Sequence, residues 1–75
     1  RILVIGLGGG ILPAALEHLF PEAQIDVVEI DPAVIRVAET HFGYRPGART
    51  RIVAEDGRVF VKRQVGAGAS YDLVM

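Results

Sequence analysis

The residues of this chain that could do chemistry are glycines and carboxylates, and they follow its apolar runs. Four glycines fall within five positions after the first run: Gly6, Gly8, Gly9 and Gly10. Carboxylates follow the second and third runs: Glu29 and Asp31, then Glu55 and Asp56 with Gly57 behind them. Glycine lacks a Cβ, so a glycine turn accepts positive φ and lets a ligand approach the backbone, while a helix after the turn offers free N–H groups. This combination indicates a site for a nucleoside or a phosphate.

The distance from the glycines to Glu29 favours a nucleoside with a free ribose. Glu29 lies 23 positions after Gly6, close to the spacing of about 20 residues at which an acidic residue meets ribose hydroxyls in nucleotide-binding βαβ units. The turn reads GxGxG. The dinucleotide pattern GxGxxG would place its last small residue at Ile11, where a branched side chain is predicted to hold helix and strand apart. The turn therefore favours a ligand without a pyrophosphate.

Alternating strands and helices are predicted to bring these residues to one edge of a sheet. Short apolar runs predict strands at 1–5, 25–30, 51–54 and 71–75. Helices are predicted from the glycines to Phe20, from Pro32 to Phe42 with Asp31 as N-cap, and from Gly57 to Val65. The fold class is α/β, a partial Rossmann-like doubly wound parallel sheet of about four strands, order 3-2-1-4, with three helices. We expect the ligand crevice at the carboxyl ends of the first and fourth strands, over the glycine turn.

Apolar residues at three- and four-residue spacing predict which helix faces are buried. The predicted stripe of the first helix is Leu12, Ala15, Leu16, Leu19 and Phe20, and that of the second is Val34, Ile35, Ala38 and Phe42. Glu17 and both histidines, His18 and His41, fall off these stripes. Neither histidine has a second ligand at metal-binding spacing, so no metal site is predicted.

Composition limits the class of protein. The chain has 75 residues, 51% of them apolar, and a mean hydropathy of +0.37, more apolar than a small self-contained domain usually is. We therefore expect a piece of a longer chain, with apolar surface meant for other segments. Charge is balanced, with 8 basic and 9 acidic residues, so no nucleic-acid partner is predicted. Cysteine is absent and no membrane segment is present in the sequence, which fits a cytoplasmic protein.

Four motifs resemble the class I fold of S-adenosylmethionine-dependent transferases, and in particular its spermidine synthase-like (polyamine aminopropyltransferase-like) branch. They are Ile5-Gly6-Leu7-Gly8-Gly9-Gly10, Val28-Glu29-Ile30-Asp31-Pro32, Glu55-Asp56-Gly57 and Tyr71-Asp72-Leu73-Val74. The resemblance implies that residues 1–75 form the nucleoside-binding core of the transferase domain. It implies S-adenosylmethionine or decarboxylated S-adenosylmethionine as donor, without a metal, and a small-molecule amine or other acceptor. It also allows a homodimer of the full-length protein.

The resemblance also implies roles for individual residues. The glycine turn would lie along the methionine-like part of the donor, and Glu29 would hold the ribose hydroxyls. Ile30 would pack on the adenine, and Asp56 would accept from its amino group with Gly57 close to the ring. Asp31 is predicted to cap the second helix as well as border the site. The catalytic residue is expected beyond Met75.

Two positions depart from the patterns of the resembled enzymes. Spermidine synthases usually carry an aspartate where this chain has Gly9, and many methyltransferases carry an acid where it has Val4. Several functions therefore stay open beside aminopropyl or related alkyl transfer. They are an S-adenosylmethionine-dependent methyltransferase, a catalytically inactive donor-binding module and an NAD-dependent oxidoreductase.

Overall fold

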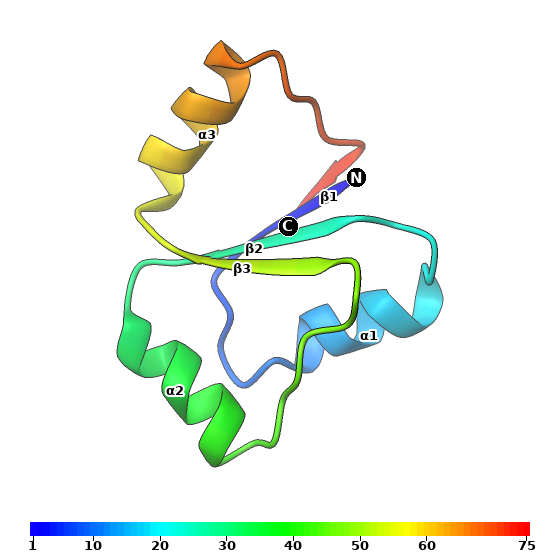
Figure 1. Ribbon diagram of the computed structural model, residues 1–75, viewed down its shortest axis with the longest axis vertical. Helices are drawn as coiled ribbons and strands as arrows, with labels where there is room; N and C mark the ends of the chain where they lie inside the picture. The colour runs from blue at the N-terminus through cyan, green and yellow to red at the C-terminus, as the bar shows by residue number, and fades with distance from the viewer.

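The structure, a computed structural model, describes the whole chain from Arg1 to Met75. Strands and helices alternate as predicted: β1 (Ile2–Ile5), α1 (Ile11–Leu19), β2 (Ile25–Glu29), α2 (Pro32–Thr40), β3 (Thr50–Ala54), α3 (Gly57–Gly66) and β4 (Leu73–Val74). The predicted fourth strand, 71–75, is shorter in the structure, with two residues in β4. Figure 1 shows the two chain ends close together at β1 and β4.

All four strands are parallel and form one sheet in the order β3-β2-β1-β4, which confirms the predicted topology. Ile5 pairs with Val28 and Glu29 pairs with Ala54, so the carboxyl ends of β1, β2 and β3 meet at one edge. The loops that follow these strands begin at this same edge. The sheet thereby brings together the glycine turn and the carboxylates that follow β2 and β3.

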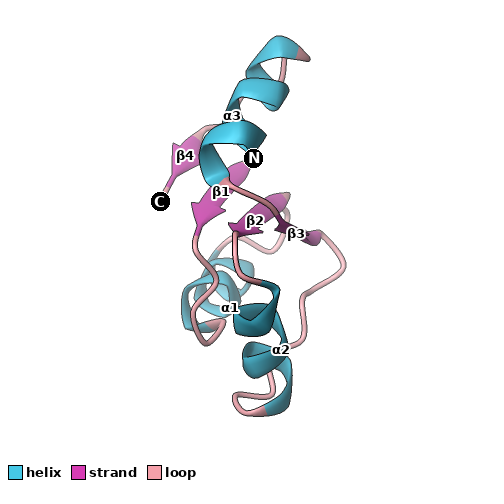
Figure 2. Cartoon of the chain, turned by 90° about the vertical axis from the view of Figure 1, so that its left-hand side faces the viewer, coloured by secondary structure: helices cyan, strands magenta, loops and turns pink.

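Helices cover both faces of the sheet, α1 and α2 on one and α3 on the other (Figure 2). Alternate side chains of the strands serve the two faces, as the pleat requires. Ile2, Val4, Ile25 and Val27 pack with Leu16, Ala38 and Tyr44 on the α1/α2 side. On the α3 side the buried cluster is smaller and contains Leu3, Val28 and Phe60.

The predicted buried stripe of α1 is wrong for most of its members. Only Pro13 and Leu16 are buried in this helix, and Leu19 is 66% exposed. A helix of nine residues presents only a narrow strip to the sheet, and that strip runs through Pro13 and Leu16. Glu17, which follows Leu16, is partly buried. Its Oε1 accepts hydrogen bonds from the Tyr44 hydroxyl, the Thr50 hydroxyl and the Gly47 N–H.

The second helix follows its prediction until its end. Ala38 is fully buried and Val34 and Ile35 are partly buried in the same cluster. Phe42, predicted to be buried, is 62% exposed, because α2 ends at Thr40 and Phe42 lies beyond it. Its ring lies against the glycine turn instead of the core.

One charged side chain is completely buried on the α3 face. Asp26 in β2 has no exposed surface, and its Oδ2 accepts hydrogen bonds from the Tyr71 hydroxyl at 2.7 Å and from Arg1 at 3.0 Å. Arg51 of β3 lies 3.3 Å from the same oxygen. Burial by itself raises the pKa of Asp26, but the bonds from Tyr71 and Arg1 and the charge of Arg51 outweigh it and hold that pKa below the ordinary 3.8.

Candidate functional site: a pocket at the carboxyl ends of the strands

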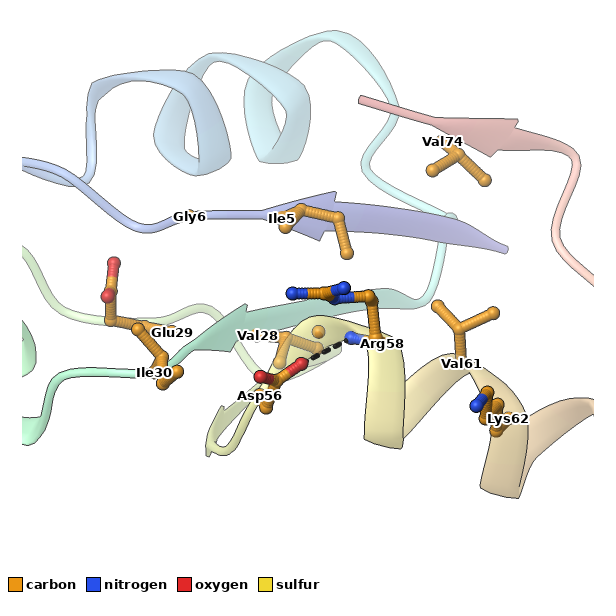
Figure 3. Close-up of a pocket in the computed structure, with 11 residues that line it drawn as sticks. Ile5, Gly6, Val28, Glu29, Ile30, Asp56, Arg58, Val61, Lys62 and Val74 are labelled. Atoms are coloured by element: carbon orange, nitrogen blue, oxygen red, sulfur yellow. Dashed lines mark hydrogen bonds between the residues drawn. The ribbon is translucent and has the colours of Figure 1, made fainter.

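A pocket opens where the strands end. It has a volume of about 640 Å³ and is lined by residues from four segments: Ile5 and Gly6; Val28, Glu29 and Ile30; Asp56, Gly57, Arg58, Val61 and Lys62; and Val74. Figure 3 shows the ends of β1 and β2 on one side of it and α3 on the other. The site lies at the predicted edge of the sheet, but it extends farther toward β2 and α3 than the predicted crevice between the first and fourth strands.

Five of the nine predicted ligand residues line this pocket: Gly6, Glu29, Ile30, Asp56 and Gly57. The acidic and the apolar residues among them differ in exposure. Glu29 and Asp56 are partly buried at its edges, whereas Ile30 is 65% exposed and offers an apolar surface to anything that enters. Acidic groups and an apolar platform therefore face the same space.

The glycine turn has structural reasons for each of its glycines. Gly6, Gly8 and Gly10 have φ values of 96°, 56° and 84°, a region that side chains rarely adopt. A Cβ on Gly9 would lie 3.3 Å from the ring of Phe42. Of the four, only Gly6 lines the main pocket.

The end of the turn is packed against an aromatic side chain. A Cβ on Gly10 would lie 2.4 Å from the ring of Tyr44, which is itself buried. Gly9 and Gly10 line a second, open hollow with Phe42 and Tyr44, separate from the main pocket. Burial and the hydrogen bond to the Glu17 carboxylate both raise the pKa of Tyr44, so its hydroxyl stays a donor in this packing.

The prediction that Ile11 holds the helix and the strand apart is wrong. Ile11 is 78% exposed at the start of α1, so its side chain does not separate the helix from the sheet. The sheet-facing positions of this helix are Pro13 and Leu16. The choice between a dinucleotide and a smaller nucleoside therefore rests on other observations.

Glu29 joins the two loops that border the pocket. Its Oε1 accepts from the N–H of Leu7 at 3.0 Å and its Oε2 accepts from the N–H of Asp31 at 3.1 Å. A carboxylate has about four acceptor positions, so each oxygen keeps one for a further donor. Glu29 is thus fixed in place and still able to accept from a pair of hydroxyls.

The two aspartates at the helix starts are N-caps. Asp31 Oδ1 accepts from the N–H of Ala33 and Asp56 Oδ1 accepts from the N–H of Arg58, as the N-cap preference requires. Asp31 does not line the pocket, whereas Asp56 does. Behind Asp56, a Cβ on Gly57 would lie 3.2 Å from Ile5, so glycine lets the start of α3 approach the end of β1.

Sequence reasoning missed the α3 wall of the pocket, formed by Arg58, Val61 and Lys62. Their spacing of three and four residues after an Asp-Gly helix start was the available signal, because it places them on one face of α3. They lie opposite the strand ends (Figure 3), and they add two positive charges to the acidic groups of the site.

No group of three or more His, Asp or Glu side chains is arranged to hold a metal ion, and His18 and His41 are both exposed. None of the helices combines the length and the apolar character needed to pass through a membrane.

Known proteins are similar to this chain in sequence. A polyamine aminopropyltransferase of Vibrio vulnificus is 48% identical over 75 residues, covering 100% of this chain and 25% of that protein. The human eEF1A lysine and N-terminal methyltransferase is 39% identical over 77 residues, covering 99% of this chain and 11% of that protein. No family model matches the chain.

A solved structure extends the likeness to three dimensions. The crystal structure of human methyltransferase-like protein 13 in complex with SAH has a TM-score of 0.89 to this chain at 39% identity, covering 99% of this chain and 35% of that one. The chain spans a quarter or less of the length of the two curated relatives above. The chain is thus a homologue of polyamine aminopropyltransferase and of the eEF1A lysine and N-terminal methyltransferases, and its structure matches the class I fold of the SAH-bound methyltransferase.

Proposed function

We propose that residues 1–75 form the donor-binding core of a transferase domain that uses S-adenosylmethionine or decarboxylated S-adenosylmethionine. The observation that carries this proposal is the convergence of Gly6, Glu29 and Asp56 on one pocket at the carboxyl ends of three parallel strands. In open α/β sheets this edge is where ligands bind. The relatives and the SAH complex of the structural neighbour support the choice of a nucleoside with a sulfur substituent.

The residues of the pocket fit such a nucleoside. Glu29 keeps an acceptor position on each oxygen and would hold the ribose hydroxyls. Ile30 presents an apolar surface suited to one face of the adenine. Asp56, with Oδ2 not engaged in a hydrogen bond of the chain, would accept from the adenine amino group, with Gly57 close to the ring.

A sulfonium donor, when bound, supplies an electrophilic carbon whose bond to sulfur breaks as the acceptor attacks, leaving a neutral thioether. The chain's own contribution is to hold the nucleoside in place and so orient the reacting carbon. We propose that the acceptor is a small-molecule amine or another nucleophile. We propose that a residue outside 1–75 takes the proton from this acceptor. For the full-length protein we propose a homodimer. Aminopropyl or related alkyl transfer, as in spermidine synthase-like enzymes, is the first candidate, supported by the 48% identity to the aminopropyltransferase.

Methyl transfer is the second candidate, and the identity of one turn residue favours it. By the family resemblance, aminopropyltransferases carry an amine-binding aspartate at the position that corresponds to Gly9 of this chain. A Cβ on Gly9 would lie 3.3 Å from the ring of the exposed Phe42, so a small shift of that ring would make room for a side chain. It is therefore the glycine itself that leaves the turn without a negative charge for a polyamine.

Calorimetry on the full-length protein tests the donor site. We expect binding of SAH and of S-adenosylmethionine or its decarboxylated form, and no binding of NADH. The preferred sulfonium form then separates methyl from aminopropyl transfer, and turnover with amine acceptors separates an enzyme from a binding module. Tight NADH binding without a response to the nucleoside sulfur compounds would overturn the proposal.

The ribose role of Glu29 has a sharper test, because its substitution also removes two bonds to backbone. We expect Glu29→Ala to weaken binding of 5′-methylthioadenosine by about 1–3 kcal/mol. The 2′-deoxy analogue isolates the ribose contact, since it should bind wild type more weakly than methylthioadenosine and lose less affinity on Glu29→Ala. Arg36→Ala, on the exposed side of α2, is the matched control. Equal losses for both ligands would assign Glu29 a purely structural role.

A further inference from the structure

Two positive side chains line the pocket without a carboxylate partner. Arg58 and Lys62 stand one turn apart on α3, and neither takes part in any ion pair of the chain. The pocket's own carboxylates do not pair with these cations, because Glu29 accepts from backbone N–H groups and Asp56 caps α3. The charges of the α3 wall are therefore available to a ligand.

Arg58 is the one that reaches over the pocket. Figure 3 shows its side chain extending from α3 across the space toward Ile5, above Val28, while Lys62 stays farther along the helix. The surfaces around it are apolar, from Ile5, Val28 and Val61. A cation covered by a ligand there loses hydration, and that loss must be offset by a contact with the ligand.

The flat face of an aromatic ring provides such a contact for a guanidinium. Arginines of this chain already lie over aromatic rings on the α3 side of the sheet. The guanidinium of Arg51 lies 5.7 Å and that of Arg63 lies 5.5 Å from the ring centre of Phe60. Arg1 lies 5.0 Å from the ring centre of Tyr71. These distances are within the range of about 6 Å at which a cation is attracted to a ring.

We propose that Arg58 is a specificity-determining residue of the donor site, with its guanidinium lying flat against the open face of the nucleobase. The inference rests on the proposed function, in which the base occupies this pocket with Ile30 at its other face. Arginine suits the role because its planar group stacks on rings, whereas the ammonium of lysine is a strongly hydrated point charge. Arg58 thereby closes the pocket over the base and favours ligands that carry one.

The experiment compares SAH with S-ribosylhomocysteine, which lacks the base, on the full-length protein. We expect Arg58→Ala to raise the Kd for SAH by about 2- to 30-fold and to leave the Kd for S-ribosylhomocysteine unchanged. Arg58→Lys retains the charge without the planar group and should stay weaker than wild type for SAH. Arg36→Ala, which removes an exposed arginine of α2, should change neither value.

The Arg58 variants should fold, because they keep the backbone N–H of residue 58 that donates to the N-cap Asp56. Circular dichroism checks that they do. Equal weakening of both ligands by Arg58→Ala, or full affinity in Arg58→Lys, would overturn the stacking role. Failure of the wild type to bind SAH is a different result and would overturn the proposed function itself. Wild-type binding of SAH with no change on Arg58→Ala would remove the Arg58 inference alone.

Discussion

Replacing Gly10 by alanine tests whether the last glycine of the turn serves packing or ligand binding. Gly10 has φ 84°, which costs an alanine about 1–2 kcal/mol in backbone strain. Its Cβ would also lie 2.4 Å from the ring of Tyr44, and overpacking of this kind costs about 1–3 kcal/mol. We therefore expect Gly10→Ala to lower the free energy of unfolding by about 2–5 kcal/mol in total.

Gly8→Ala is the matched control for the backbone term. Gly8 also has a positive φ, 56°, but no atom lies within 4 Å of its would-be Cβ, so only the strain of about 1–2 kcal/mol applies. Urea unfolding of the full-length protein, followed by far-UV circular dichroism, gives both values. A Tyr44→Ala substitution removes the Cγ and Cδ1 atoms that the new Cβ would meet, so its effect and that of Gly10→Ala should be less than additive.

Binding measurements complete this test. Gly10 lies outside the main pocket, so Gly10→Ala protein that remains folded should bind SAH as wild type does. Equal destabilisation by Gly8→Ala and Gly10→Ala would refute the packing argument. Weaker SAH binding by a fully stable Gly10→Ala protein would instead make Gly10 a ligand-facing residue.

Two further predictions concern the core. Leu16→Ala should cost about 2–5 kcal/mol of unfolding free energy and Leu19→Ala about 0.5 kcal/mol or less, because Leu16 is 4% exposed and Leu19 is 66% exposed; comparable losses in urea unfolding would contradict the observed face of α1. Asp26→Asn should destabilise the protein at pH 7 by about 1.5–3 kcal/mol, since it removes the charge that accepts hydrogen bonds from Tyr71 and Arg1 and pairs with Arg51, while the two arginines are partly exposed and keep some hydration. The pKa of Asp26 lies below the ordinary 3.8, so its stabilising effect is present above that pH and is lost as the pH falls through the lower folded-state value. The gap between wild type and Asp26→Asn in thermal unfolding should therefore narrow below about pH 4, and a gap independent of pH would count against the charge-based account.

The sheet and the placement of the site could be predicted because they depend on local signals. The apolar runs, the N-cap Asp31 and the positions of Gly6 and Glu29 are all readable from neighbouring residues, and the parallel order follows from the handedness of crossovers. These signals were enough to bring Glu29 and Asp56 to the same edge.

What could not be predicted depends on contacts between distant segments. Asp26 lies within an apolar run and gives no sign of its partners, because Tyr71 is 45 positions away. The buried face of α1 depends on how the helix crosses the sheet, and periodicity alone does not choose between Leu16 and Leu19 as the inward position. For the α3 wall, the spacing of Arg58, Val61 and Lys62 places them on one face of the helix, but the direction in which that face points depends on Gly57 meeting Ile5.

The two hydrogen bonds of Glu29 to backbone have a consequence for the thermodynamics of binding. They hold the glycine turn, through Leu7, and the loop after β2, through Asp31, in one arrangement before any ligand arrives. The conformational entropy of these loops is then lost during folding rather than during association. Binding of a small nucleoside therefore costs little further loop entropy. By ordering the two loops in advance, the Glu29 carboxylate raises the affinity of the site for the nucleoside without adding a contact.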